Sequence, residues 1–406
     1  MKTKASKFIS CCKYELGIFV LLCIQALMNL NEIKNMLLDF YSYYLVDFSM
    51  GKTSRLLIGS IVSLLTDKPT AAWIHGFAVV VLFLTLLATA LIIGKVIKSA
   101  SDEMRPCLLV LTLFFVSGSF TLYGFSKFFG MLDIYMYIAA MLAVVFAPNK
   151  YLRWLIPALS VAGIFVNYSF AISFFPIIAL VTLYTAATQK RKGTDSTVFA
   201  LTVALSVAAG VFCVFYGSKT MNMTFDEIWQ SIEQRSGLKF DYKNIRYFDF
   251  YFFGNGQGEA ELQFKDFTPL ELIKILPRIV FMFGVSSEGA QSILAITLFM
   301  IAAFWTVWIM CIKNSETAGR KFIYLCFMLS VLFIPVCCIV STDWTRWIQA
   351  GILTQFGLMY YMFYMKDEPF TKTMQRLKEL FSGGKGLALA AVWLAYASSI
   401  QTTWSV

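Results

Sequence analysis

The run AWIHGFAVVVLFLTLLATALIIGK, residues 72–95, is apolar for long enough to cross the hydrocarbon core of a bilayer as one helix. Comparable runs recur along the 406-residue chain, in which 58% of the residues are hydrophobic and 14% are charged. A soluble domain normally carries about 25% charged residues. Alternating polar and apolar strands are absent, whereas helices satisfy their own backbone hydrogen bonds in lipid. The sequence therefore predicts an all-α, polytopic helical membrane protein.

We expect about eleven transmembrane helices in a single integral membrane domain that covers residues 1–406. They centre on residues 15–31, 72–95, 107–126, 130–147, 151–167, 168–187, 197–216, 289–312, 321–341, 346–364 and 387–404. Asn167, Tyr168 and Ser169 interrupt the region 151–187, which forms either two short helices or one broken helix. No small-residue cleavage site follows the first run, so we expect that run to be retained as a helix.

The distribution of lysines and arginines predicts the orientation. With the N-terminus in the cytoplasm and the spans alternating, most of these residues fall in the segments that face the cytoplasm. The C-terminus then lies outside, and the protein is a multi-pass protein of the cell membrane. The net charge of +10 is explained by this topology and by contact with the anionic lipid bilayer, so no nucleic acid is expected as a partner.

Two segments predicted on the outer side are long. The first outer loop, residues 32–71, contains the short apolar stretches Ile33–Leu45 and Leu56–Leu65, which we expect to form interfacial helices. The second, the large outer loop near residues 217–288, holds the aromatic run from Tyr242 to Phe253 and the glycine-rich GNGQG at 254–258. We expect a short amphipathic helix over Thr268 to Arg278 to lead back to the membrane.

A cytoplasmic amphipathic segment is predicted at residues 366–386. Phe370, Met374, Leu377 and Phe381 recur there at helical spacing among basic residues, which is typical of a helix on the membrane surface.

Cysteine and histidine usage argues against two kinds of active site. The nine cysteines show no metal-ligand spacing and suit small apolar positions in helices. The chain has one histidine, His75, near the start of an apolar run. A histidine-based metal site and a Ser-His-Asp triad are therefore not expected, and we assign no metal ligands.

Polar residues beside apolar spans are the informative ones, because they are costly in a membrane. The stretch LVDFSMGKTSRLLIGSIVSLL, residues 45–65, carries Asp47, Lys52 and Arg55 between two apolar segments. The other polar residues at predicted outer span ends are Lys127 and Asp133 in SKFFGMLDIYMY, Asn167 and Tyr168, Glu288 and Gln291, and Asp343, Trp344 and Arg346 in STDWTRW. Five separate regions thus bring acids and bases to one membrane face.

Each of these residues also has a structural interpretation. Asp47 suits the cap of a surface helix, and Lys52 and Arg55 suit contact with phospholipid headgroups. Asp343 and Arg346, three residues apart, suit a local ion pair. Trp344 and Trp347 suit an interfacial aromatic belt. Asp133 lies inside an apolar run, where an acid usually has a polar partner or a function.

This arrangement resembles the C-type membrane glycosyltransferases of bacterial cell-envelope glycan assembly. The likeness covers most of the chain as architecture and is carried by Asp47 in the first outer loop and by Asp133. LVDFSMGKTSRLLIG and DWTRW also look like motifs of uncharacterised bacterial envelope proteins. The chain departs from the family pattern because the first loop has no adjacent acidic pair and no large C-terminal soluble domain follows.

The resemblance implies a polyprenyl-phosphate-linked sugar as donor, a glycan as acceptor, and hexosyl or pentosyl transfer at the outer leaflet. Asp47 would be the general base, and Arg55, Lys52 or Arg346 would neutralise the leaving phosphate. Asp133 and Asp343 would orient the acceptor, hold a metal or position an arginine. The other expected substrate-binding residues are Lys127, Asn167, Tyr168, Trp344 and Glu288. No cofactor is required, and a divalent cation is compatible with this chemistry.

Three other functions remain open at this point. An O-antigen-type polysaccharide polymerase would depend on arginines, here Arg235, Arg246, Arg278 and Arg346. A transporter or flippase of lipid-linked oligosaccharide would need a polar path through the bundle or paired broken helices. A non-catalytic scaffold of envelope assembly would need neither.

Overall fold

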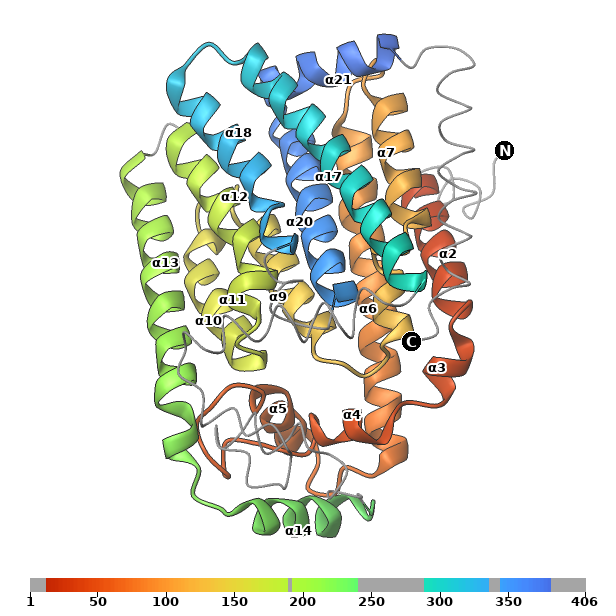
Figure 1. Cartoon of the computed structure of the whole chain (residues 1–406), viewed down its shortest axis with the longest axis vertical. Helices are drawn as coiled ribbons and strands as arrows, with labels where there is room; N and C mark the ends of the chain where they lie inside the picture. Colours follow the sequence, from red (N-terminus) through yellow and green to blue (C-terminus); the bar gives the residue numbers. More distant parts are fainter. Residues whose placement is uncertain (1–11, 189–191, 240–287, 336–343, 381–406) are drawn as a thin grey trace, which may run out of the picture.

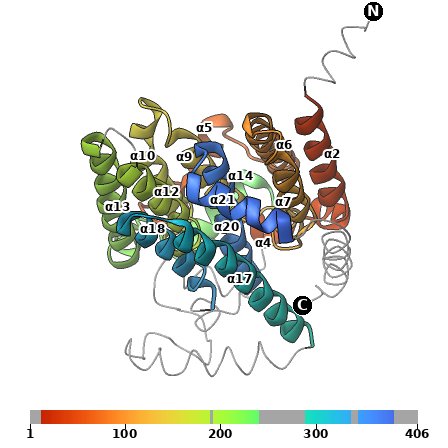
Figure 2. The same cartoon turned by 90° about the horizontal axis from the view of Figure 1, so that it is seen from above.

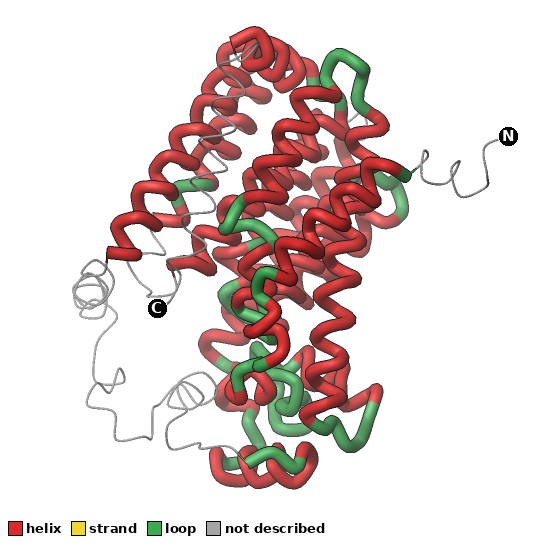
Figure 3. Tube along the Cα trace, turned by 90° about the vertical axis from the view of Figure 1, so that its right-hand side faces the viewer, coloured by secondary structure: helices red, strands yellow, loops and turns green. Residues whose placement is uncertain are grey.

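The computed structural model describes residues 12–188, 192–239, 288–335 and 344–380. Within these ranges the chain forms helices and short connections, with no strand (Figure 1). Long helices run between two ends of the molecule, one covered by α14 (Phe225–Ser236) and the other by α21 (Glu368–Leu380). Figure 3 shows the same bundle from the side, with helices along most of its length and loops gathered at the α14 end. The predicted all-α class is therefore confirmed for the described residues.

Four described helical segments are long and apolar enough to cross a membrane. They are Ala71–Ser99 (α6), Gly193–Cys213 in α13 (Lys192–Phe215), Thr297–Asn314 in α17 (Glu288–Asn314), and Ala318–Pro335, which begins with α18 (Ala318–Ser330). Their outward faces carry exposed apolar side chains, such as Leu84 on α6 and Val207 on α13, each 58% exposed. Contact of such faces with water costs about 25 cal/mol per Å², whereas contact with lipid tails does not. The helices thus suit a bilayer.

The remaining bundle helices are shorter or less apolar. They are α2 (Lys13–Leu27), α7 (Arg105–Ser117), α9 (Asp133–Phe146), α10 (Ile156–Val166), α12 (Phe175–Thr188) and α20 (Trp344–Met365). Every predicted span except 387–404, which lies outside the described residues, overlaps at least one helix. Several of these helices are shorter than a straight crossing requires, so the eleven crossings stay a prediction. The largely buried α20 contacts α6, α9, α12 and α17 and forms the centre of the bundle.

The interrupted region 151–187 forms two short helices rather than one broken helix. The backbone leaves the helical conformation at Asn167, just after α10. The Asn167 side-chain oxygen accepts a hydrogen bond of 3.0 Å from the Ser169 amide, a local bond that replaces a helical one. A single turn, α11 (Phe170–Ser173), then leads into α12. Asn167 therefore ends α10 through its own side chain.

The predicted first outer loop contains three short helices, α3 (Leu30–Lys34), α4 (Leu38–Ser42) and α5 (Leu57–Leu65). The predicted stretch Leu56–Leu65 corresponds to α5, whereas Ile33–Leu45 is divided between α3 and α4. Figure 1 shows α4 and α5 at the α14 end. Gly59 lets α5 pack directly on the backbone, because a Cβ atom there would lie 1.7 Å from the Val46 carbonyl oxygen. The Asn222 amide and side chain donate 3.0 Å bonds to the carbonyls of Met50 and Ser49. The loop and the segment before α14 thus form one layer over this end.

The predicted amphipathic segment at 366–386 contains α21, which crosses the other end of the bundle (Figure 2). Its apolar face packs on protein, and we correct the prediction of a helix lying on lipid in this respect. Phe370 is fully buried, with its ring 4.9 Å from that of Phe363 and 6.0 Å from that of Trp308. The Asp367 carboxylate accepts a 3.1 Å bond from the Phe370 amide and begins the helix. Phe381 lies outside the described residues.

Candidate functional site

The structure joins two of the predicted site residues, Asp133 and Arg346, from helices distant in sequence. Asp133 is the first residue of α9, and Arg346 lies in the first turn of α20. The Arg346 Nη2 atom lies 2.8 Å from Asp133 Oδ2, and Nε lies 3.2 and 3.1 Å from the two carboxylate oxygens. The two side chains are 17% and 13% exposed. This forked contact fixes the two groups relative to each other, and both remain partly exposed.

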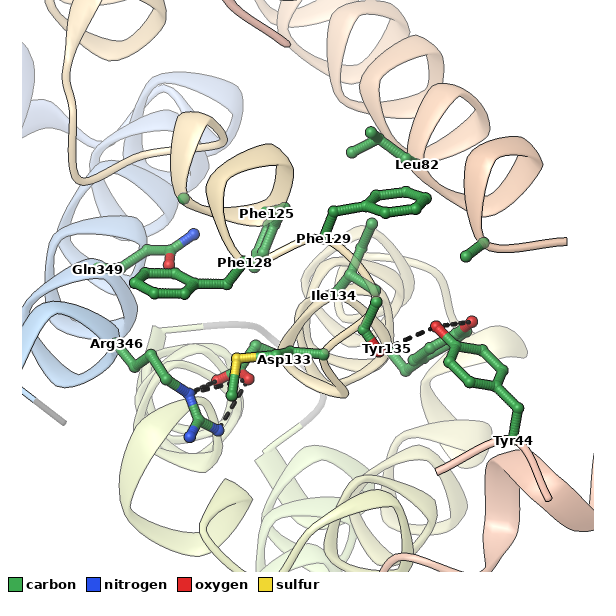
Figure 4. Close-up of a pocket in the computed structure, with 14 residues that line it drawn as sticks. Tyr44, Leu82, Phe125, Phe128, Phe129, Asp133, Ile134, Tyr135, Arg346 and Gln349 are labelled. Carbon is green, nitrogen blue, oxygen red and sulfur yellow. Dashed lines mark hydrogen bonds and ion pairs between the residues drawn. The ribbon is translucent and has the colours of Figure 1, made fainter. Parts of the chain in front are cut away.

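A small cleft of about 10 Å³ opens beside this pair (Figure 4). Its polar members besides the pair are Tyr44, Tyr135 and Gln349, and phenylalanines from the 125–129 segment form much of the remaining wall. The Tyr135 hydroxyl donates to the Tyr44 hydroxyl at 3.3 Å. An acid, a base, an amide and aromatic faces thus line one small space.

Backbone features hold the cleft in shape. Gly130 has φ 98°, a conformation that side-chain-bearing residues rarely adopt, and its carbonyl accepts a 3.1 Å bond from the Tyr44 hydroxyl. A Cβ atom at Gly130 would also lie 2.7 Å from the Met36 methyl group. Burial raises the pKa of Tyr44, so its hydroxyl remains a donor at neutral pH. Gln349 is held by a 2.8 Å bond from its Nε2 to the Thr121 carbonyl.

Asp47 lies in a separate network. Its Oδ1 accepts from the Ser49 amide and hydroxyl, and its Oδ2 accepts from the Ser63 hydroxyl at 2.6 Å and from Arg235 Nη1 at 2.7 Å. Arg235 comes from α14 and also donates to the Leu45 carbonyl and to Ser63. Burial acts to raise the pKa of Asp47, but the bonds from Ser49, Ser63 and Arg235 outweigh it and lower that pKa.

The four donors occupy both oxygens of the Asp47 carboxylate, and a lowered pKa makes a carboxylate a weaker base. The geometry therefore gives Asp47 a structural role, because it joins α14 to the first outer loop. Its predicted role as general base is not tested by this geometry and stays a prediction.

Arg55 is held in an unusual conformation. It has φ 74°, its amide donates a 2.8 Å bond to the Phe165 carbonyl, and its side chain is buried. The guanidinium carbon lies 5.9 Å from the centre of the Tyr43 ring and 5.8 Å from that of Tyr168. Cation–π contacts of this kind hold a charge away from water. Positive φ at a non-glycine residue costs about 1–3 kcal/mol and is often found at functional sites.

None of the other predicted site residues whose side chains the structure describes lines the cleft. Lys52 is exposed, with its amide bonded to Thr220, and Lys127 pairs with Glu32 at 2.7 Å. The Asn167 side chain is used locally, as described above. Trp344 begins α20 and packs partly against the core. Glu288 is the first residue of α17, and Asp343 lies outside the described residues.

Sequence reasoning named Arg235 only for the polymerase alternative and missed Tyr44, Tyr135 and Gln349 as members of the cleft. A signal for Arg235 was present, because Thr224 and Glu227 form a capping box that starts α14 and places Arg235 in its last turn. Nothing in the sequence signals Tyr44 or Gln349, because the backbone path of other segments brings them to the cleft. Within the described part of the chain, no group of three or more His, Cys, Asp and Glu side chains forms a possible metal site.

No protein-family model, no curated protein and no solved structure matches this chain. The resemblance to C-type glycosyltransferases therefore stays a prediction, and the function has to be argued from the site itself.

Proposed function

We propose that this chain is a membrane glycosyltransferase that uses a polyprenyl-phosphate-linked sugar to extend or modify a cell-surface glycan. The cleft beside Asp133 and Arg346 is its active site. The protein lies in the cell membrane with its N-terminus in the cytoplasm, so that the α14 end and the cleft face outward and the C-terminus lies outside.

The observation that carries the proposal is the forked contact of Asp133 with Arg346 at the wall of a cleft where two apolar helices begin. An acid and a base in such a position are costly, and they usually mark a substrate site. A guanidinium has five N–H donors in a planar fork, so one arginine is suited to hold a carboxylate and to contact a phosphate.

The transfer step uses both groups. The acceptor hydroxyl oxygen attacks the anomeric carbon of the donor sugar, and its proton passes to the Asp133 carboxylate. The bond between the anomeric carbon and the phosphate oxygen breaks, and the electron pair leaves with the phosphate. Arg346 neutralises the charge that develops on that phosphate. The Tyr44 hydroxyl and the phenylalanine faces of the cleft suit the hydroxyls and the apolar face of a sugar ring.

This assignment makes Asp133 the base in place of Asp47. Asp133 has one arginine partner and lies at an open cleft, whereas four donors occupy the Asp47 carboxylate. Asp47 and Arg235 act as positioning residues that hold α14 on the first outer loop. Arg55, buried beside the rings of Tyr43 and Tyr168, is a second positive charge at the same end.

Two observations favour transfer over the other functions. Arg235, one of the four arginines on which a polymerase would depend, is engaged with Asp47. Arg346 lines the cleft, and Arg246 and Arg278 lie outside the described residues. A second cavity, farther along α6, α9 and α20 than the cleft, is lined by apolar residues, threonines and tyrosines and has no charged lining residue. A transporter of charged oligosaccharide would need a polar path in this region.

Surface-glycan composition tests the proposal. Cells lacking the protein should lose a specific glycan residue, and wild-type protein should restore it. Asp133→Asn should fail to restore it at unchanged membrane abundance, because the amide cannot accept the proton. The matched control is Asp67→Asn, an exposed acid of the first outer loop, which should restore the glycan. An unchanged glycan in cells lacking the protein, or full restoration by Asp133→Asn, would contradict the proposal.

A further inference from the structure

A second cavity, of about 70 Å³, lies inside the bundle between α6, α9 and α20. Its lining includes Ala140 and Met141 of α9 and Leu353 of α20. Val145 of α9 is the one exposed residue among those that line the cavity, which places its mouth at Val144 and Val145. Val145 is 41% exposed on the outward, apolar face of the bundle. The cavity therefore opens sideways, toward the lipid chains that would surround these helices.

The hydroxyl groups of this cavity are few and mostly bonded within the protein. Thr89 pairs with the Tyr137 hydroxyl at 3.2 Å, and the Tyr360 hydroxyl donates to Thr112 at 3.1 Å. The Thr354 hydroxyl is buried without a hydrogen-bond partner among the described residues. An ordered water needs two to four polar partners, so one open hydroxyl is a poor site for water. The cavity suits a hydrocarbon better than a polar ligand.

The same three helices line the cavity and the cleft beside Asp133 and Arg346. On α20, the cleft is lined by Arg346 and Gln349 and the cavity by Leu353 and Gly357, which follow one another at helical spacing on one face. On α9, Asp133 and Ala140 are two turns apart. On α6, Leu82 lines the cleft and Thr89 and Ile93 line the cavity. The distance from Arg346 to Thr354 along the helix is roughly 12 Å.

We propose that this cavity binds the hydrocarbon chain of the lipid whose phosphate contacts Arg346. The chain enters sideways between α6 and α9 and lies against α20, while its headgroup lies in the cleft. This inference rests on the proposed function and adds to it the residues that bind the lipid chain. A substrate bound in this way is aligned by two contacts, so its reacting carbon is positioned beside Asp133.

Photolabelling of the full chain in nanodiscs tests the inference without any turnover. Two probes are compared: an isoprenyl phosphate and a phosphatidylglycerol, each with a diazirine in the middle of its chain. The isoprenyl phosphate should label peptides that contain residues 140–145 and 353–360, and unlabelled isoprenyl phosphate should compete. Ala140→Phe should reduce this labelling about tenfold, because the ring occupies the volume that the chain needs. Arg346→Gln should reduce labelling by the isoprenyl phosphate and leave labelling by the phosphatidylglycerol unchanged.

Two further variants separate loss of binding from loss of fold. Val144→Phe narrows the mouth from a partly exposed position and should also reduce labelling, with unchanged gel-filtration behaviour. Thr354→Val, which keeps the side-chain volume, should retain labelling, and a strong loss there would indicate a polar occupant and overturn the inference. Labelling confined to outward faces, or equal cavity labelling by phosphatidylglycerol, would also overturn it.

Sugar transfer measured in the same preparations separates the two proposals. Sugar transfer without labelling of the cavity would contradict the lipid-chain site but not the proposed function. Cavity labelling without transfer would contradict the proposed function and leave the lipid-chain site standing.

Discussion

At the scale of single residues, two acid–base pairs near the α14 end differ in their surroundings. Asp47 and Arg235 are enclosed by serine donors and a backbone carbonyl, so every oxygen of the carboxylate is used. Asp133 and Arg346 contact each other through the same kind of bond, but at the wall of a cleft. The first pair joins α14 to the loop that carries Asp47, and in the proposed function the second pair contacts the substrate.

The first pair predicts a loss of stability. Asp47→Asn should lower the free energy of unfolding by about 3 kcal/mol, because it leaves Arg235 without its buried partner. Thermal unfolding in detergent measures the change. The double variant Asp47→Asn with Arg235→Gln should be less unstable than the sum of the two single changes. Additive losses would show that the two side chains do not act as a pair.

The same pair predicts a pH dependence. The folded state lowers the pKa of Asp47 below its ordinary value of about 4, so its contribution is complete above that pH. The contribution is lost as the pH falls through the folded-state pKa. The thermal unfolding temperature of the wild type should therefore fall below about pH 4 more steeply than that of Asp47→Asn. Parallel curves for the two proteins in acid would contradict this assignment.

The backbone conformation of Gly130, which lines the cleft, predicts that substitution there destabilises the fold. Gly130→Ala should lower the free energy of unfolding by more than about 1 kcal/mol, because φ 98° disfavours alanine and its methyl group would meet Met36. The control is Gly319→Ala, where no atom lies near the added methyl group and the helical conformation suits alanine. Thermal unfolding compares the two, and equal stability of both variants would refute the strain argument.

At the scale of elements, helices and their breaks were predictable where local chemistry determines them. The 72–95 run is apolar on every side and forms α6 with both ends close to the predicted ones. The side chain of Asn167 ends α10 by itself, and the sequence shows that interruption. The surroundings of α21 were not predictable, because periodicity shows an apolar face but not whether protein or lipid covers it.

The N-terminal cap of α14 predicts a local effect. Thr224 accepts a bond from the Glu227 amide, and the Glu227 carboxylate accepts from the Thr224 amide at 2.7 Å. Thr224→Ala should cost about 1 kcal/mol and speed amide hydrogen exchange in residues 225–236. Thr306→Ala, an exposed threonine inside α17 with no capping role, is the control. Unchanged exchange in α14 would argue that tertiary contacts alone hold this helix.

At the scale of the whole molecule, the sequence predicted which polar residues share an end but not which of them meet. Asp133 and Arg346 are 213 residues apart, and only the packing of α9 near α20 joins them. The partner of Asp47 lies on α14, a helix that periodicity does not connect to the first outer loop. Side-chain partners of this kind depend on the path of the whole chain, which composition and spacing do not contain.

The proposed orientation can be tested on intact cells. Lys52 and Lys372 are both exposed, the first in the layer at the α14 end and the second on α21 at the other end. Lys52→Cys should gain a membrane-impermeant thiol label relative to the wild type, and Lys372→Cys should gain it only after the cells are opened. The opposite pattern would place the cleft on the cytoplasmic side and contradict the outer-leaflet reaction.

Transfer by purified protein is the most direct test of the central claim. Proteoliposomes are supplied with polyprenyl-phosphate-linked labelled sugars and with glycan acceptor extracted from the native membrane, and the initial rate of transfer is measured. The wild type and Asp67→Asn should transfer one of the sugars at similar rates, whereas Asp133→Asn should be slower by about a hundredfold or more. A rate for Asp133→Asn equal to that of the wild type, or no transfer by the wild type from any donor, would contradict the account.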